Sequence, residues 1–389
     1  MSSALPVSTS KQGDQKTTTF RRSMFKLHSW LGLKLCVLTA FISLTGALAT
    51  LAQEIDWLLN PQMRVTAPDS AQRLSLGEQL DAALTAGVAG EVATVIQRHD
   101  PWFATEIQVI TPWAERVRLW VDPYTGDYLG ATSWFNVQRF LRQTHRHLMM
   151  PVQIGVPIVS SLGVVLLLAV ATGLVVYKKF WRGWGKRPRW NLSSRVWLGD
   201  LHRLLGLWTL WFILIIALTS VWYLVESLGA RAPALPRPTI PSTAELGRTS
   251  GSQLDKAIAT ARAARPSLNP RVIRFPTERL PAFVIQGQDQ TLLVRDRANA
   301  VWTDLGGKQL GSYDGESLGL HQRIGEAADP LHFGTWGGEG WIGLMVRVTW
   351  FVLGMILFGM SLTGVVIYGT RTVDRRRSGR RAAARQSTS

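Results

Sequence analysis

Four long apolar segments divide the chain, at residues 30–52, 154–177, 204–225 and 345–368. Each is long enough to cross the hydrocarbon core of a bilayer, which takes about 20 apolar residues in a helix. Polar sequence separates them, and two of the polar segments are long. The pattern predicts a membrane α-helical protein: a four-transmembrane-helix bundle with two modules outside the membrane.

Each long polar segment begins with apolar residues at helical spacing and continues with the alternation typical of strands. In the first, LSLGEQLDAALTAG (74–87) precedes EIQVI and RVRLWVD, and DPYTGDYLG (122–130) supplies turn residues. In the second, SGSQLDKAIATARAA (250–264) precedes AFVIQ and TLLVRD, followed by DLGGKQLG (304–311). The Pro-rich stretch APALPRPTIPST (232–243) predicts an extended linker. Each segment therefore predicts a small α+β module.

The spans repeat within the chain. HSWLGLKLCVLTAFISLTGAL (28–48) aligns without gaps to HRLLGLWTLWFILIIALTSVW (202–222). The second and fourth spans share ATGLVVY (171–177) and LTGVVIY (362–368). This pattern predicts an internal two-fold repeat. Each half would hold a span, a module and a second span, and both halves would have the same orientation.

Basic residues are concentrated in the short polar segments. The net charge is +17, and residues 1–27, 178–200 and 371–389 carry five, seven and seven Lys or Arg but only three acids in all. By contrast, 53–144 has seven basic and eleven acidic residues, and 226–344 has thirteen and twelve. This is the positive-inside pattern, so both termini and the 178–200 loop are expected in the cytoplasm. It disfavours a basic arm that binds nucleic acid.

These features divide the chain into consecutive regions. They are a basic N-terminal tail (1–29), the first span (30–52), the first module (53–144), the second span with its outer lead-in (145–177), a basic loop (178–200), the third span (201–225), the second module (226–344), the fourth span (345–368) and a basic C-terminal tail (369–389). GALATLAQ (46–53) would also suit signal-peptide cleavage, but the match of the first span to the third favours a retained anchor. Cys36, the sole cysteine, allows no disulfide within the chain.

Histidines stand at the ends of the spans. The topology sorts the candidates into an inner pair, His28 and His202, and an outer set, His145, His147, His321 and His332. Two neutral imidazoles from facing helices at the same depth are what a membrane-embedded haem takes as axial ligands. Amphipathic rings in the interfacial belt are the alternative for any single histidine. A zinc or copper site is disfavoured, because the histidines of THRH do not share a helix face.

Small residues accompany these histidines. Gly32 and Gly206 lie four residues after His28 and His202, on the same helix face, and would leave room for a flat macrocycle. Each span also has a threonine followed by a small residue: Thr45, Thr172, Thr219 and Thr363. Helix geometry carries each threonine toward the histidine level of the other helix pair, where it would pack against haem. Ordinary close helix packing is the alternative.

Two cations lie within or beside the spans. Lys34 and Arg347 are candidate partners for haem propionates, since an ionisable group in a membrane is costly unless it is paired. Snorkelling of the side chain to the interface is the alternative.

Four short motifs carry a resemblance to a known family: HSWLGL (28–33), THR (144–146), DLHR (200–203) and LHFG (331–334). WVDPYTGDYLG (120–130) is similar to the strand–turn–strand of a PepSY module, whereas DLGGKQLG departs from that form. From about residue 20 to 372 the chain resembles the PepSY-associated transmembrane proteins. Within that family it is most similar to bacterial inner-membrane ferric-siderophore reductases of the ferrioxamine and ferripyoverdine type.

The resemblance implies two b-type haems, one held by His28 and His202 and the other by His145 and His332. It also implies that electrons enter at the cytoplasmic haem, cross to the outer haem and reduce Fe(III) in a periplasmic ferric siderophore to Fe(II). Two stacked haems would divide a bilayer core of about 30 Å. The hard oxygen ligands of a siderophore suit Fe(III) better than Fe(II), so reduction would release iron for uptake. Periplasmic siderophore-handling proteins are further expected partners.

The electron donor is expected to be a separate protein or a quinol. The sequence has no GxGxxG at a strand–helix turn, and a loop of about 23 residues is too short for a flavin or nicotinamide domain. Four tryptophans interleaved with Lys and Arg would either dock this donor or form an interfacial aromatic belt: Trp181, Trp184, Trp190 and Trp197. We expect the substrate near GTWGGEGW (334–341), where glycines allow close approach.

Two other functions fit parts of the sequence. The chain could be a non-enzymatic PepSY membrane protein that regulates a periplasmic peptidase or assists an uptake complex. A transporter built on parallel repeats is disfavoured, because the spans carry little polar lining. Bound haem distinguishes a reductase from both.

Overall fold

A computed structural model describes residues 10–68, 72–87, 89–177, 179–240 and 249–386. Parts of the predicted tails and linker lie outside the described residues: 1–9, 241–243 and 387–389. The chain folds into two units, which we call the helical unit and the sheet unit. The helical unit consists of Met1–Ala47, His145–Leu228 and Phe351–Ser389, and the sheet unit consists of Leu48–Thr144 and Gly229–Trp350.

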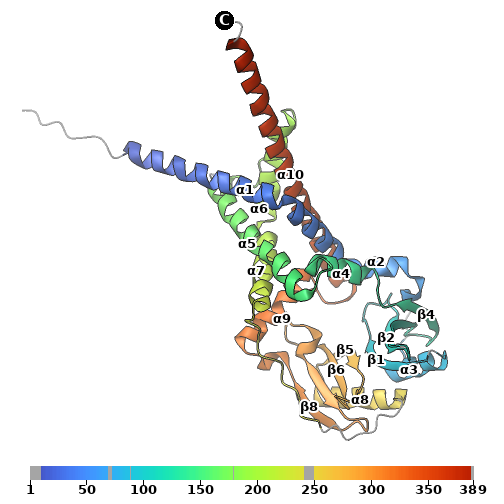
Figure 1. Cartoon of the computed structure of the whole chain (residues 1–389). Helices are drawn as coiled ribbons and strands as arrows, with labels where there is room; N and C mark the ends of the chain where they lie inside the picture. The colour runs from blue at the N-terminus through green and yellow to red at the C-terminus, as the bar shows by residue number, and fades with distance from the viewer. Residues whose placement is uncertain (1–9, 69–71, 88, 178, 241–248, 387–389) are drawn as a thin grey trace, which may run out of the picture. The chain divides into compact units, whose positions relative to one another are not determined.

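The helical unit is built from long apolar helices. Its elements are α1 (Ser10–Thr50), α5 (Val152–Val176), η2 (Phe180–Arg182), α6 (Ser194–Trp208), α7 (Leu210–Ser227) and α10 (Gly340–Gln386), of which α1 and α10 continue into the sheet unit (Figure 1). Four stretches are long and apolar enough to cross a membrane: Thr19–Thr50, Val152–Val176, Leu210–Ser227 and Gly340–Ile367. The four predicted spans are therefore confirmed as candidate membrane helices.

The third span differs from the prediction, which began it at residue 201. The helix is interrupted at Thr209, so the apolar span α7 starts at Leu210 and His202 lies on a separate helix, α6. Thr209 leaves helical geometry (φ −97°, ψ 7°), and its hydroxyl donates to the Leu205 carbonyl at 2.8 Å. Back-bonding by threonine competes with the helix ladder and bends helices. Hydropathy is averaged over a stretch of residues, so the apolar pattern did not reveal the break at Thr209.

Small residues bring the helices of this unit together. A Cβ added to Gly163 of α5 would lie 2.7 Å from Ser220 Cβ and 2.8 Å from the Ala217 carbonyl oxygen, both on α7. A Cβ on Gly354 of α10 would lie 2.9 Å from the side chain of Ala47 on α1. In lipid, where burial of apolar surface gives no net gain between helices, such close backbone approach is the main source of attraction.

Within the residues that the structure describes, the sheet unit contains eight strands, with helices before, between and after them. Its helices are α2 (Ala52–Leu59), α3 (Leu76–Thr85), α4 (Val137–His147, whose last turn belongs to the helical unit), α8 (Gly251–Ala264) and α9 (Leu320–Phe333), with 3-10 turns η1 (Pro61–Met63), η3 (Asp296–Ala298) and η4 (Gly315–Ser317). Its strands are β1 (Glu91–Ile96), β2 (Thr105–Ile110), β3 (Arg116–Val121), β4 (Tyr128–Ser133), β5 (Asn269–Arg274), β6 (Phe283–Gln288), β7 (Ala300–Thr303) and β8 (Gln309–Tyr313).

The two predicted modules share a single sheet. The strand order is β4-β3-β2-β1-β5-β6-β7-β8, and every neighbouring pair is antiparallel. The first four strands come from one module and the last four from the other, and β1 pairs with β5 through Val95 opposite Ile273. This pairing hides the edge strand that each module would otherwise expose. The sequence predicted two modules but not their fusion.

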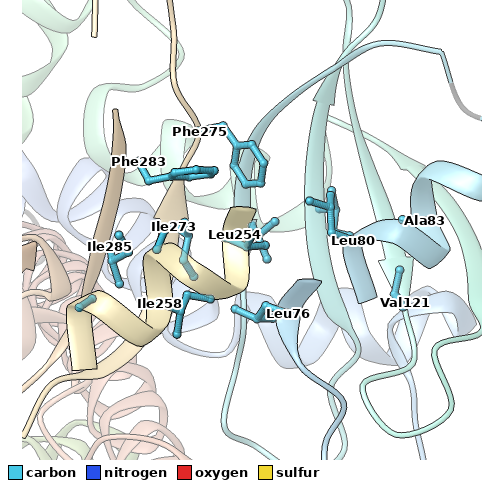
Figure 2. Packing of buried hydrophobic residues seen from close by; sticks show 14 of the residues in the cluster. Leu76, Leu80, Ala83, Val121, Leu254, Ile258, Ile273, Phe275, Phe283 and Ile285 are labelled. Carbon is cyan, nitrogen blue, oxygen red and sulfur yellow. The ribbon is translucent and has the colours of Figure 1, made fainter. Parts of the chain in front are cut away.

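Helices α3 and α8 supply one hydrophobic core that runs across both modules. Leu80 and Leu254 from the helices and Ile107, Ile273 and Phe283 from the strands are all buried. Figure 2 shows labelled members of this cluster from both modules packed in one continuous layer. Both helices begin as the sequence predicted, each with a serine whose hydroxyl and a side chain three residues later form a capping box.

The first turns of α3 and α8 cap each other reciprocally. The Gly77 N–H donates to Asp255 Oδ1 and the Gly251 N–H donates to Asp81 Oδ1, both at 2.8 Å. These contacts satisfy first-turn amides that have no partner within their own helix, and they place a carboxylate at each positive helix end. Each glycine is required by space, because a Cβ on Gly77 would lie 2.3 Å from Asp255 Oδ2.

One predicted strand is wrong. TLLVRD (291–296) forms a turn that leads into η3, and the strand after β6 is AVWT, the residues of β7. Leu292 is 82% exposed and Leu293 has a φ of +58°, so neither follows an extended, half-buried pattern. The apolar letters resembled a strand, but the buried register opposite β6 is taken by Ala300–Thr303.

Replacement of Gly77 by alanine is expected to destabilise the sheet unit by about 2 kcal/mol, because the methyl group overpacks the α3–α8 contact. Thermal unfolding of the full-length protein in detergent would measure this. Gly319→Ala is the matched control, since Gly319 has a φ of −65° and a Cβ there meets nothing closer than 3.7 Å. Equal unfolding temperatures for the two variants would contradict the reciprocal capping contact.

Candidate functional site

The inner histidines face each other within the helical unit. The rings of His28 on α1 and His202 on α6 have centroids 6.5 Å apart and planes at 81°. Both side chains are part-buried. The sequence predicted this pair, and the structure brings the two rings together.

The Nδ1 atom of each inner histidine is already engaged. His28 Nδ1 lies 3.1 Å from the Ala169 carbonyl and 3.0 Å from Thr172 Oγ1, and His202 Nδ1 lies 3.1 Å from Thr363 Oγ1. The Thr172 hydroxyl donates its proton to the Leu168 carbonyl at 2.6 Å, and the Thr363 hydroxyl donates to its own helix in the same way. Each threonine oxygen is thus left to accept.

These contacts fix the tautomer. Since the partners accept, Nδ1 carries the proton on both rings, and the lone pair stands on Nε2. Metal-ligating histidines characteristically donate their other ring N–H to a carbonyl or similar acceptor, which orients the ring. Metal–imidazole bonds are about 2 Å long, so two of them plus the inner halves of both rings span about 6 Å between centroids. The separation and the donor set therefore fit an iron between the two rings.

Two glycines lie against histidine rings, and one of them, Gly46, is required by the space that the ring occupies. A Cβ on Gly46 would lie 2.6 Å from His145 Cε1, and a Cβ on Gly173 would lie 3.5 Å from His28 Cε1. The sequence had assigned the small residues after Thr45 and Thr172 to haem clearance. In the structure, Gly46 and Gly173 lie against the histidine rings themselves.

His145 repeats the pattern of the inner pair. It stands at the end of α4, and its Nδ1 donates to the Ile42 carbonyl of α1 at 2.9 Å. The carbonyl can only accept, so Nε2 again holds the lone pair. His145 is therefore oriented as a ligand would be.

His332 stands near the end of α9 in the sheet unit. The following Gly334 ends the helix in the left-handed conformation (φ +67°), and Trp350 Nε1–H donates to the Leu331 carbonyl at 3.0 Å. Because His145 and His332 belong to different units, their predicted pairing stays a prediction.

A buried carboxylate anchors the helix that carries His332. Glu326 is 3% exposed and accepts from Arg295 Nε (2.8 Å) and Arg297 Nε (3.0 Å), while Arg295 Nη1 also reaches Asp329 at 2.7 Å. Burial alone would raise the pKa of Glu326, but the hydrogen bonds and charges of the two arginines outweigh it and lower that pKa. The network ties α9 to the loop after β6.

A second buried carboxylate anchors the helix that carries His145. Asp56 is 1% exposed and accepts from the backbone N–H groups of Val137 (3.1 Å) and Gln138 (3.0 Å) at the start of α4. Nothing in the local sequence pattern links residue 56 to a helix that starts 81 residues later.

The remaining predicted residues lie in varied settings. Gly32 has open space around its Cβ position, whereas a Cβ on Gly206 would meet Met360 Cε at 3.1 Å. The hydroxyls of Thr45 and Thr219 donate to carbonyls of their own helices. Lys34 is exposed. These positions neither exclude nor require a bound macrocycle.

Arg347 has a protein partner. Its Nε donates to Glu54 Oε1 at 2.8 Å, and Nη1 lies 3.3 Å from the Gly338 carbonyl. The sequence analysis predicted this arginine as a candidate partner for a haem propionate. In the structure its charge is balanced by Glu54, within the sheet unit.

The remaining histidines lie in other settings. His147 packs its backbone against Gly155 of α5, where a Cβ would lie 2.2 Å from the His147 carbonyl oxygen. His321 opens α9, far along the helix from His332. His99 donates its backbone N–H to Glu339 at 2.8 Å.

The sequence did not reveal the carbonyl acceptors Ala169 and Ile42. A backbone carbonyl carries no side-chain signature, so only the packing of α1 against α5 and α4 identifies them. Gly46 and Gly173 were visible as small residues, but their role depends on which ring lies opposite.

A family model described as the PepSY-associated TM region matches residues 25–371. The matched range includes all four histidines predicted as ligands. No curated protein matches the chain.

Glu326→Gln is expected to destabilise the sheet unit by about 2 kcal/mol at pH 7, less than for a fully buried ion pair because the arginines are part-exposed. The pKa of Glu326 is lowered in the folded state, so its contribution is present above about pH 4.5 and declines as the pH falls through the folded pKa. Unfolding of both proteins between pH 7 and pH 4 would measure this. A pH-independent difference would contradict the ion-pair role.

Proposed function

The chain belongs to the PepSY-associated transmembrane family, and on this premise we propose that it is a dihaem reductase that passes electrons across a bacterial inner membrane to a periplasmic ferric siderophore. The observation that carries the proposal is the inner histidine pair. Two rings 6.5 Å apart, each held at Nδ1 and each with a free Nε2 lone pair, are suited to one shared iron.

Several residues of the helical unit would together hold the inner haem, each with its own role. His28 and His202 would hold the iron through Nε2, and Thr172, Thr363 and the Ala169 carbonyl keep both imidazoles in the tautomer that this requires. Gly32 leaves open space one helical turn after His28. A haem held by two histidines would be suited to electron transfer rather than to binding dioxygen.

His145 and His332 are proposed as the outer ligand pair. His145 supports this assignment through its oriented ring, which Ile42 and Gly46 hold in place. His332 supports it through its place at the end of α9, a helix that Glu326 holds against the loop after β6. The bound haems would supply one-electron steps between Fe(II) and Fe(III). The protein orients the groups and separates the two levels.

The charge distribution supports the orientation of the chain. The basic segments 1–27, 178–200 and 371–389 would lie in the cytoplasm, and the sheet unit would lie in the periplasm, where it meets the siderophore. Siderophore oxygens hold Fe(III) more tightly than Fe(II), so one electron per iron is sufficient for release.

We also infer that the two halves of the chain are an internal repeat. The two carboxylates of the reciprocal contacts, Asp81 and Asp255, are 174 positions apart, and so are the glycines Gly77 and Gly251 that donate to them; the same offset relates His28 to His202. Both halves of the sheet unit place one helix before four strands. A self-complementary contact of this kind is what a two-fold relationship between similar elements produces.

Purified protein from haem-replete cells is expected to bind two b-type haems and to show a Soret shift on reduction by dithionite. His202→Ala should remove about half of the haem, because one of the two sites loses an axial ligand. Oxidised and reduced visible spectra with haem quantification measure both. His99→Ala is the control and should keep both haems. Protein without haem would support the non-enzymatic alternative, in which the chain regulates a peptidase or assists uptake.

Thr363→Val is expected to weaken inner-haem binding about tenfold or more and to shift one of two midpoint potentials, since it removes the acceptor that orients His202. Redox titration of the purified protein measures the shift. Thr349→Val is the matched control on α10, because the exposed Thr349 bonds only its own helix carbonyl among the contacts observed. Two unchanged potentials would refute the orienting role.

A further inference from the structure

We propose that the folded loop 179–193 together with α6 is the docking surface for an acidic, soluble one-electron carrier, such as a flavodoxin or an iron–sulfur ferredoxin. This inference rests on the proposed function, because it concerns the source of the electrons that the inner haem would receive. It is carried by the charge, order and position of the loop.

The loop is fastened to α6 at several points. Arg189 forms a two-pronged contact with Asp200, Nε to Oδ2 at 2.8 Å and Nη2 to Oδ1 at 3.1 Å. The indole N–H of Trp208 donates to the Trp184 carbonyl at 3.1 Å, and the two rings lie 5.7 Å apart. A loop held in this way presents its side chains without a large loss of entropy on binding.

The surface of this region is strongly cationic. Seven exposed cations lie on it: Lys179, Arg182, Lys186, Arg187, Arg189, Arg195 and Arg203. Between residues 178 and 208 the sequence has one acid, Asp200, and both of its oxygens are taken up by Arg189 and Arg203.

The cations stand close to the inner ligand pair. Asp200, which anchors Arg189, lies two residues before His202 on the same helix, about 3 Å along its axis. Arg203 directly follows His202, and its guanidinium lies 5.9 Å from the centre of the Tyr177 ring. A carrier held by these groups would bring its redox centre to the end of the helical unit where the inner haem is proposed.

Exposed aromatic rings add contact area. Trp181 is 62% exposed and Trp190 is 60% exposed, and Trp190 is stacked against Trp197 at 5.4 Å. Tryptophan and arginine are the residues most enriched where protein partners bind tightly. Complementary charge steers association and sets orientation, which suits a transient electron-transfer complex.

A protein partner explains these features better than a quinol or lipid does. A neutral quinol would approach through the bilayer and would make no use of seven exposed cations. Lipid phosphates attract basic side chains without requiring the loop to be fixed by Asp200 and Trp208. The fixed arrangement beside His202 is what a specific, short-lived complex needs.

The test uses the full-length protein in nanodiscs of neutral phosphatidylcholine, with reduced flavodoxin and reduced ferredoxin as probes. The double variant Lys186→Glu/Arg187→Glu is compared with Arg274→Glu/Arg279→Glu, which reverses two exposed cations of the sheet unit. Stopped-flow reduction of haem and direct binding of the carrier to the nanodisc are both measured, at low and high ionic strength.

The proposal predicts that at least one carrier binds and reduces the wild-type protein at a rate that falls with salt. The loop variant should lose about tenfold or more in both binding and rate, and the control pair should change neither. Reduction by dithionite should be equal in all variants, which shows that the haem sites are intact.

Three results would overturn the inference: rates that are insensitive to salt, an unaffected loop variant, or reduction by a quinol but by neither carrier. A loss of anionic-vesicle binding in the loop variant, with unchanged carrier binding, would assign the surface to lipid. Absence of haem would overturn the proposed function, whereas carrier binding is measured independently of haem.

Discussion

The hydrogen bond at Nδ1 of His28, His202 and His145 is the interaction on which the candidate site depends. A polar ring between helices must find a partner inside the protein, because lipid offers none. His28, His202 and His145 all find acceptors, either backbone carbonyls or threonine oxygens whose own proton is already donated. The same contact that satisfies the ring also decides its tautomer, and it leaves the lone pair on Nε2.

In the sheet unit, too, polar groups that have no partner in their own helix bond to groups from distant parts of the chain. Helix ends have amides without partners, and here the partners are carboxylates from distant sequence: Asp255 and Asp81 for the two core helices, and Asp56 for the helix that leads to His145. Each contact joins two elements that are far apart in the sequence. The helix that leads to His145 is therefore held at its start by Asp56 of α2, and the helix that carries His332 is held at its middle, where Glu326 contacts the loop after β6.

Part-buried ion pairs connect the sheet to the beginning of the fourth span. Arg271 of β5 pairs with Glu339 at 2.9 Å, and Arg347 of α10 pairs with Glu54 of α2 at 2.8 Å. Removal of one member would leave an uncompensated charge, which is costly away from water. The first turns of α10 are thus part of the sheet unit, so the apolar pattern that predicted a span from residue 345 missed the five residues before it that complete the helix.

The sequence by itself determined the features that follow from local pattern. Four apolar segments, two helix–strand modules and two histidines 174 residues apart, each at the start of a similar apolar segment, can all be read from residue spacing, since hydrophobic periodicity acts over short distances. Tertiary structure alone decided the fusion of the modules through β1 and β5, the break at Thr209 and the acceptors of the histidine rings. Strand pairing, helix breaks and backbone carbonyls depend on which distant segment packs opposite, and no local pattern of side chains records that choice.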